Sequence, residues 1–400
     1  MHRGRAPREA WRFQRQRIIG GKPREVSLPG VETAPVALIE PSRTRFERGG
    51  GRCALRYHGV VGVLHFIFGI VIEPIHIINA FDSTTRGSER AALALARLLA
   101  VHARVMVWST TPSPPAVVGL AAQFGVALRQ IRPFAGAFPR GGTLILWGTH
   151  FIPGRWLSAA ASDAVLILSE TFNFSSLYRA VLEVREAGLP EARVLYVSTL
   201  LRDSAQWPGG VLYPLPDMAT LLRVEREAAP HPFTVGRVSR DIPEKHHADD
   251  PALYSALAAA GVRVRILGGT CLAARIPPHP LIELLPEGSV AVDRFLATLD
   301  TFFFRTGGDR IYVEPSGLAF AEAMVAGLPV VAGGPGGFTD LVVDGVNGYA
   351  TGTQDEALDA ILRLAQDESL RLRLGHASRA HVVDYFGPAY GYRFAALAWP

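Results

Sequence analysis

The chain has 400 residues, which is too long for one ordinary hydrophobic core, so we expect about two or three domains. Hydrophobic residues make up 48% of it and charged residues 19%, as is usual for a globular chain. The only cysteines are Cys53 and Cys271. They exclude a disulfide framework and a zinc site, and they indicate a reducing, cytoplasmic compartment.

The positive charge is concentrated at the start of the chain. Residues 1–57 carry 13 Arg or Lys against 5 Asp or Glu, whereas the remaining chain carries 28 against 31. This distribution argues against a nucleic-acid-binding face on the body, so no nucleic-acid partner is expected. Residues 1–57 have no sustained periodicity and read as a basic, disordered arm or as translation from an upstream start. A functional arm that binds anionic lipid stays open as the less favoured interpretation.

An apolar segment, residues 58–73, follows the arm. Its core, "GVVGVLHFIFGIVI", has 14 residues and ends at Glu73 and Pro74. That is shorter than the roughly 20 residues that cross a bilayer. We therefore expect a core or interfacial segment, with peripheral membrane contact at the inner face as an option. No signal peptide fits, because the preceding basic stretch is too long.

From Pro74 the sequence alternates between buried strands and helices. Continuous apolar runs of strand length, such as "IHIINAF", "RVMVWST", "TLILWG", "AVLILS" and "RVLYVST", alternate with helical stretches such as "GSERAALALARLLA" and "SLYRAVLEVREAG". Strands that are apolar on both faces and alternate with helices indicate a parallel sheet covered on both sides. Residues 74–217 are predicted to form the first Rossmann-like domain.

A proline- and charge-rich linker, residues 218–231, precedes a second Rossmann-like domain over residues 232–386. Its strands are "FTVGRVS", "VRVRILGG", "TFFFRT" and "LPVVAGG", and "DPALYSALAAAG" is a helix with Asp250 as its cap. Residues 387–400 are expected to form a helix that returns towards the first domain. The fold class is therefore α/β, two tandem Rossmann-like domains with a cleft between them.

Two cations follow the first strand of the second domain. Arg237 and Lys245 leave the same strand end, where parallel sheets bind ligands, and could grip a diphosphate as a fork and a point charge. Lys245 is the only lysine after Lys22 in a chain with 39 arginines, which favours a function over a solvated surface cation. The nearby "HHADD" has no further His or Cys spaced to complete a metal site.

Two glutamates lie around the start of a small-residue helix that begins near Gly317. Free N–H groups at that start attract an anion, and glycine lets the anion approach closely. Glu322 follows five residues later, about 7.5 Å along the helix, where a carboxylate suits a ribose diol. Glu314 precedes the helix, on the side where a sugar attached to the diphosphate would lie. By spacing alone, a capping and a surface glutamate are as good an interpretation.

The surrounding residues carry a family resemblance. The stretch "EPSGLAFAEAMVAGLPVVAGGPGGFTDLVVDGVNGY" closely resembles the donor-binding signature of the GT-B retaining glycosyltransferases of family four, the glycosyl transferases group 1. "VGRVSRDIPEK" looks like the Gly-Arg-…-Lys phosphate motif of that group, and "RGSER" is similar to its N-terminal glycine-rich loop, here Gly87 and Ser88. Departures are Ser316 for a phenylalanine, Asp340 for a glutamate and Ser88 for a glycine.

The resemblance implies a metal-independent, cofactor-free enzyme that moves a hexosyl group from a nucleotide-diphosphate sugar to a glycan or lipid-linked acceptor with retention. Its donor-binding residues in the second domain would be Arg237, Lys245, Gly317, Leu318, Glu314 and Glu322, of which Arg237, Lys245 and Glu314 would act in catalysis. The first domain would bind the acceptor through His150 and Glu170, and His150, near the reacting sugar, would also act in catalysis. No Asp-x-Asp occurs in the chain, so a bridging metal has no obvious ligands.

Alternatives remain open. A nucleotide-sugar epimerase or hydrolase would share the nucleotide site but need an acid/base pair. A non-catalytic sugar-nucleotide binding protein also fits. A dinucleotide oxidoreductase does not, because no Gly-x-Gly-x-x-Gly follows the first strand.

Overall fold

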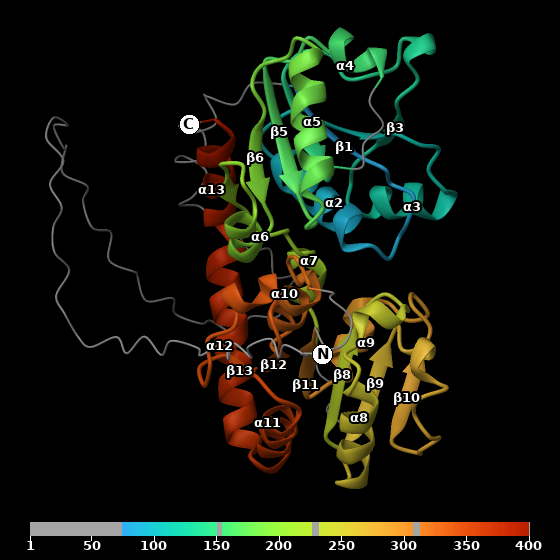
Figure 1. Cartoon of the computed structure of the whole chain (residues 1–400), viewed down its shortest axis with the longest axis vertical. Helices are drawn as coiled ribbons and strands as arrows, with labels where there is room; N and C mark the ends of the chain where they lie inside the picture. Colours follow the sequence, from blue (N-terminus) through green and yellow to red (C-terminus); the bar gives the residue numbers. More distant parts are fainter. Residues whose placement is uncertain (1–73, 150–153, 226–231, 307–312, 400) are drawn as a thin grey trace, which may run out of the picture. The chain divides into compact units, whose positions relative to one another are not determined.

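The computed structural model describes residues 74–149, 154–225, 232–306 and 313–399. The basic arm, the apolar segment 58–73 and His150 lie outside the described residues. Two parallel sheets, one of seven strands and one of six, are covered by helices (Figure 1). This confirms the predicted class of two tandem α/β units, which we call the first and second lobes.

The first lobe has the strand order β3-β2-β1-β4-β5-β6-β7. Its strands are β1 (Ile75–Asn79), β2 (Val105–Ser109), β3 (Leu128–Gln130), β4 (Thr143–Trp147), β5 (Ala164–Ser169), β6 (Arg193–Tyr196) and β7 (Gly210–Val211). Its helices are α2 (Gly87–Leu99), α3 (Pro115–Gln123), α4 (Arg155–Ala159), α5 (Phe174–Glu186) and α6 (Thr199–Ser204). The central strand β1 pairs in parallel with β2 and β4, with Ile75 opposite Val105 and Thr143.

The alternation of side chains along these strands divides the core of the first lobe. Ile75 and Ile77 pack with α2, whereas Ile78 faces the opposite side with residues of α4 and α5. Each strand is therefore buried on both faces, which is why its sequence is a continuous apolar run. The sequence pattern predicts no element between residues 111 and 142, where the structure has α3 and the edge strand β3.

The second lobe has the strand order β10-β9-β8-β11-β12-β13. Its strands are β8 (Thr234–Val238), β9 (Arg263–Leu267), β10 (Ile282–Leu285), β11 (Thr301–Arg305), β12 (Val330–Gly333) and β13 (Gly348–Thr351). Its helices are α8 (Asp250–Ala259), α9 (Val292–Ala297), α10 (Leu318–Val325), α11 (Gln354–Gln366) and α12 (Glu368–Phe386). The short helix α7 (Met218–Leu221) lies between the two sheets in the sequence.

The helix α13 (Pro388–Ala398) contacts the first lobe after α12 has packed on the second. The Tyr390 hydroxyl donates to the Tyr213 carbonyl at 2.6 Å, and Nε1 of Trp399 donates to Oγ1 of Thr143 at 3.0 Å. One hydrophobic cluster contains residues of α2, α10, α12 and α13 and so extends through both lobes. These contacts fix the two sets of strand ends that form the site.

Candidate functional site

A cavity of about 920 Å³ is lined by loops that follow the carboxyl ends of strands in both lobes. Parallel α/β sheets bind their ligands at this end of the strands. The first lobe contributes, among others, residues 79, 80, 82, 84–90 and Glu170, and the second contributes residues 238–240, Lys245, 287, 288, 290–292 and 314–322 except for Ala321. The cavity therefore brings together most of the site residues that the sequence predicted.

Lys245 and Glu314 form the ion pair at the centre of the second-lobe wall. Nζ of Lys245 donates to Oε2 of Glu314 at 2.6 Å, and each side chain is 11% exposed. The Gly317 N–H donates to Oε1 of the same carboxylate at 3.3 Å. Burial alone would raise the pKa of Glu314, but Lys245 and the N–H groups of Gly317 and Ser316 hold it below its usual value. A fixed cation and a fixed carboxylate thus lie side by side in the cavity.

The helix α10 starts at this pair. Its N-cap residue is Gly317, as predicted, with a φ of 73° that side chains other than glycine rarely adopt. A Cβ at this position would lie 2.8 Å from Cβ of Phe338, so the site needs glycine for space as well. Leu318 and Ala319 follow, and both line the cavity. The first turn of α10 therefore presents the positive end of its dipole to a ligand.

The start of α2 in the first lobe lies against the start of α10. A Cβ built on Gly87 would come within 3.1 Å of Cδ2 of Leu318, and one on Gly288 within 3.0 Å of Cγ2 of Thr85. Glycine at both positions permits this close approach. Two helix starts, one from each lobe, converge on the same cavity, which favours an anion between them.

Glu322 contacts a residue that the sequence analysis did not select. NH2 of Arg90 in α2 lies 3.3 Å from Oε1 of Glu322, whose side chain is 7% exposed. Burial raises the pKa of Glu322, and Arg90 opposes the shift. The predicted contact of Glu322 with a ribose therefore stays a prediction, and in this structure the carboxylate links the two lobes.

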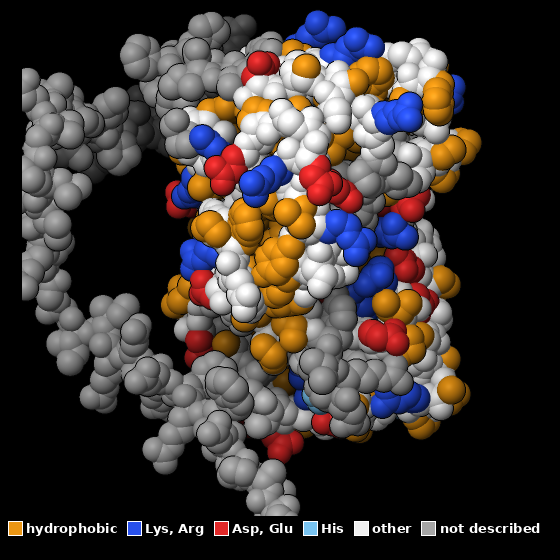
Figure 2. All heavy atoms as spheres, turned by 45° about the horizontal axis from the view of Figure 1, so that its top comes forward, with side chains coloured by type: hydrophobic (Ala, Val, Ile, Leu, Met, Phe, Trp, Pro, Cys, Tyr) orange, Lys and Arg blue, Asp and Glu red, His pale blue; other side chains and the backbone are white. Residues whose placement is uncertain are grey.

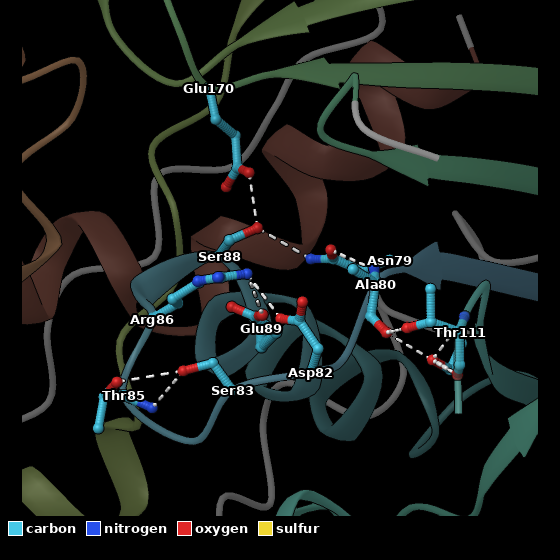
Figure 3. A network of polar contacts seen from close by, with 11 residues as sticks. Asn79, Ala80, Asp82, Ser83, Thr85, Arg86, Ser88, Glu89, Thr111 and Glu170 are labelled. Atoms are coloured by element: carbon cyan, nitrogen blue, oxygen red, sulfur yellow. Dashed lines mark hydrogen bonds and ion pairs between the residues drawn. The ribbon is translucent and has the colours of Figure 1, made fainter. Parts of the chain in front are cut away.

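Ser88 and Glu170 belong to a polar network in the first lobe (Figure 3). Oγ of Ser88 donates to Oε2 of Glu170 at 2.6 Å and accepts from Nδ2 of Asn79 at 2.8 Å. Nε1 of Trp147 donates to the other oxygen of Glu170 at 2.7 Å. Burial raises the pKa of Glu170 in spite of these two donors. The serine that departs from the glycine pattern thus orients a carboxyl group at the cavity wall.

Glu89 adds a second carboxyl group to this wall. Its side chain is 2% exposed, and NH1 of Arg86, which also binds Asp82 at 2.6 Å, lies 3.7 Å from Oε1 (Figure 3). Oε2 of Glu89 has no hydrogen-bond partner among the described residues. Burial is the main cause that raises the pKa of Glu89 to about 7. The sequence signal was present, because Glu89 falls in the first turn of the helix that follows Gly87.

Arg237 is buried away from the cavity surface. Its side chain is 0% exposed and does not line the cavity. NH1 binds Oδ2 of Asp250 at 3.0 Å, NH2 donates to the Lys245 carbonyl, and the guanidinium lies 4.1 Å from the Phe304 ring centre. The structure thus places this arginine behind the wall, where it supports the backbone that carries Lys245. A buried carboxylate holds it there, and its predicted contact with a diphosphate stays a prediction.

Asp250 was predicted to cap α8, but it has a different role in the structure. The structure makes Asp249 the N-cap of α8, and the Asp250 carboxylate binds Arg237 and, at 3.1 Å, Arg305. The N–H of His247 donates to it as well, at 2.9 Å. His246 packs beside this group, and burial lowers its pKa to about 3. Over the described ranges no cluster of three or more His, Cys, Asp or Glu is arranged to hold a metal ion.

Ser316 and Asp340, the two other residues that depart from the family pattern, lie at the boundary between the lobes. Oδ2 of Asp340 accepts from the N–H of Thr199 at 2.9 Å, at the start of α6. Oγ of Ser198 donates to the Pro315 carbonyl at 2.5 Å, next to Ser316, which lines the cavity. Asp340 itself does not line the cavity. The Asp340 side chain, which is shorter than the usual glutamate, therefore forms a hydrogen bond between the two lobes.

Part of the chain is similar to a known protein family. Residues 283–381 match the family Glycosyl transferases group 1. The chain is 35% identical over 85 residues to an alpha-maltose-1-phosphate synthase of Mycobacterium tuberculosis, covering 19% of this chain and 22% of that protein. It is 33% identical over 153 residues to a D-inositol 3-phosphate glycosyltransferase of Mycobacterium bovis, covering 34% and 31%. The matched region thus spans less than a third of the length of these curated relatives.

Solved structures show the fold. Anabaena Alr3699/HepE, solved in complex with UDP and glucose, has a TM-score of 0.62 at 17% identity and covers 80% of this chain and 98% of that one. WaaG, a glycosyltransferase involved in lipopolysaccharide biosynthesis, has a TM-score of 0.54 at 13% identity and covers 81% and 99%. Both have the GT-B architecture. The chain therefore has the GT-B fold, and its residues 283–381 are similar to the glycosyl transferases group 1 family.

Proposed function

We propose that this protein transfers a hexosyl group from a nucleotide-diphosphate sugar to a glycan or lipid-linked acceptor, with retention of the anomeric configuration and without a metal ion. The Lys245–Glu314 pair supports the proposal most directly, because it stands at the start of α10 inside a cavity that both lobes line. HepE, which shares the fold, was solved with UDP-glucose. The relatives named above are a glycosyltransferase and a sugar-phosphate synthase.

In the proposed complex the diphosphate lies between the starts of α2 and α10, near Gly87, Gly317 and Leu318. Lys245 turns from Glu314 to the phosphate, and the freed carboxylate accepts hydrogen bonds from the donor sugar. Glu322 takes the ribose hydroxyls in place of Arg90. The leaving diphosphate is then stabilised by one ammonium group and two helix starts, which is catalysis by placed positive charge.

The proposed reaction needs no protein base. The bond between the anomeric carbon and the phosphate oxygen breaks, and its electron pair leaves with the diphosphate. The acceptor oxygen forms its bond to the same face of the sugar, and its proton passes to the departing phosphate oxygen. Glu170, oriented by Ser88 and Trp147, holds the acceptor hydroxyl beside that face. His150 stays a predicted acceptor-side residue.

The proposed location is the cytoplasm, with peripheral contact at the inner face of the membrane. The described part of the chain contains no helix of the length and apolar character that a bilayer span requires. Cys271 is a free thiol, which agrees with a reducing compartment.

A two-stage experiment tests the proposal. Thermal shift with UDP, GDP, ADP and dTDP identifies the nucleotide, since a ligand that binds the folded state stabilises it in proportion to its concentration over its Kd. The matching nucleotide sugar is then supplied with candidate acceptors, and the anomeric configuration of the product is read by NMR. An inverted product overturns the retaining mechanism, and stabilisation by none of the four nucleotides overturns the donor assignment.

A second function, hydrolysis or epimerisation of the nucleotide sugar, is favoured by one observation. Glu89 has a pKa of about 7 and lies in the cavity wall, where a carboxyl group of this kind suits acid/base chemistry. Incubating the donor without acceptor separates the two functions. Release of free sugar or of an epimer at the rate of transfer supports the second, and an unchanged donor supports transfer.

A further inference from the structure

One stretch of the first lobe is free of acidic residues. Residues 90–162 contain seven arginines and no Asp or Glu. The rest of the chain after residue 57 has 21 Arg or Lys against 31 Asp or Glu, from the totals of 28 and 31 given above. The described body therefore combines a strongly basic region with an acidic remainder. Such a charge distribution orients a molecule in the field of an anionic surface.

Two of the seven arginines form ion pairs with residues outside this stretch. Arg90 pairs with Glu322, and Arg97 lies 3.8 Å from Asp217. In contrast, Arg129, Arg132 and Arg140 are exposed, and within the described ranges no carboxylate pairs with any of them. Their partners among the described residues are aromatic rings and an amide, so no carboxylate neutralises their charge there.

Contacts through buried aromatic residues bring these arginines together. The Arg129 guanidinium lies 5.6 Å from the centre of the Trp108 ring. Nε1 of Trp108 donates to Nδ1 of His76 at 3.0 Å, and Nε2 of His76 lies 3.2 Å from the Arg140 carbonyl. Arg132 donates to the side chain of Gln130 in the same edge strand, β3. These contacts place the Arg129 guanidinium and the Arg140 backbone beside the Trp108–His76 pair, and Arg132 follows the edge strand β3.

Phe134 lies two residues after Arg132 and is fully exposed. It lies in the short 3₁₀ turn Pro133–Ala135, which is closed by paired backbone hydrogen bonds between Arg132 and Ala137. Its relative exposure is 108%, so the ring touches almost nothing of its own chain. We call Arg129, Arg132, Phe134 and Arg140 the Arg–Phe patch. Figure 2 shows blue Lys or Arg side chains with orange hydrophobic side chains between them along the upper part of its face.

We propose that the Arg–Phe patch docks the first lobe on an anionic lipid bilayer. The three arginines suit phosphate headgroups, since each basic residue near such a surface contributes about 1 kcal/mol. The fully exposed ring on a tight turn enters the headgroup region, where an aromatic side chain is more stable than in water. A single-stranded nucleic acid would use the same cations and stack a base on the exposed ring, so RNA binding is one of the outcomes that the test below distinguishes. The contact is independent of the chemistry in the cavity and of the basic arm.

Vesicle flotation of the full chain tests this proposal, with phosphatidylcholine vesicles that contain or lack phosphatidylglycerol. The variants are Arg132→Ser/Arg140→Ser and Phe134→Ser. The double variant should lower the partition coefficient on the anionic vesicles about 30-fold, and Phe134→Ser about 10-fold. The arm is present in every sample, so it contributes equally throughout.

Matched controls come from the second lobe. Arg294→Ser/Arg373→Ser removes two exposed arginines, and Val346→Ser removes an exposed apolar side chain that is 54% accessible. These variants should bind vesicles like the unaltered protein, and all variants should keep its melting temperature and nucleotide affinity. Equal binding by patch and control variants overturns the proposal. So does binding of an RNA oligonucleotide with the same dependence on Arg132 and Arg140 when the vesicles show none.

Discussion

Nζ of Lys245 lies 2.6 Å from Oε2 of Glu314, although 69 positions separate the two residues in the sequence. The pair joins the loop after β8 to the start of α10, and both side chains are 11% exposed. A cation and an anion held this closely balance each other until a ligand separates them. The cavity can therefore bind a diphosphate through one partner and sugar hydroxyls through the other.

Replacing Lys245 by methionine is expected to weaken nucleoside diphosphate binding by about 10- to 100-fold, because hydrogen bonds to charged groups contribute about 1.5–3 kcal/mol. Titration calorimetry with the nucleotide found in the thermal-shift screen measures the change. Arg373→Met, which removes an exposed cation on α12, is the control. An unchanged Kd for Lys245→Met would remove this residue from the diphosphate site.

Alanine substitutions at Gly317 and Gly345 separate the effect of steric overlap from the effect of backbone strain. Both have positive φ, at 73° and 72°, but a Cβ on Gly317 meets Phe338 at 2.8 Å, while one on Gly345 has nothing within 4 Å. Gly345→Ala should cost about 1–2 kcal/mol of stability and keep nucleotide affinity. Gly317→Ala should cost more and also weaken nucleotide binding, since the start of α10 must shift. Urea denaturation and calorimetry measure the two effects, and equal behaviour of the two variants would contradict the steric argument.

Asp250→Asn should destabilise the second lobe strongly. The carboxylate is the partner of two buried arginines, Arg237 and Arg305, and removing one member of a buried ionic group costs about 3–5 kcal/mol. The neighbouring Asp249, whose side chain is 61% exposed, provides the control, and Asp249→Asn should change stability by less than about 0.5 kcal/mol. Similar urea midpoints for the two variants would show that Asp250 does not hold the arginines.

The pH dependence of stability should report Glu89. Its folded-state pKa is raised to about 7 from 4.5, so the folded protein binds the proton more tightly than the unfolded chain does. Stability from this group is therefore present below about pH 4.5 and is lost as the pH rises towards 7, by about 3 kcal/mol in total. Glu89→Gln stays neutral, so its stability relative to the unaltered protein should increase between pH 5 and pH 8 by up to about that amount. A difference that is constant over this range, measured by urea denaturation, would contradict the buried carboxyl.

The parallel sheets and the start of α10 were predictable because their signals are local. A continuous apolar run such as β1 can only be buried on both faces, and Gly317 before a small-residue helix marks its start without knowledge of distant contacts. The placement of Lys245 and Glu314 in one cavity followed from the rule that loops at strand ends share a site.

The role of Arg237 was not predictable in this way. Its position at the end of β8 is the same whether it points to the ligand or to the core, and Asp250 and Arg305 decide between the two from other elements. The Arg90–Glu322 contact likewise joins two lobes across 232 positions. Sequence spacing within one segment contains no information on such pairs, so the sequence offers a ligand contact or an exposed helix position for Glu322 but not the contact with Arg90.

The bond from Trp399 to Thr143 spans 256 positions of the chain. Ribosomes add about 5–20 residues per second, so roughly 10 to 50 seconds separate the synthesis of the strand from that of the helix that covers it. During this interval the nascent first lobe exposes apolar surface that α13 later buries. Because the helix that closes the fold is synthesised so late, the nascent chain should depend on chaperones during translation. It should aggregate when heterologous expression exceeds the chaperone capacity of the cell.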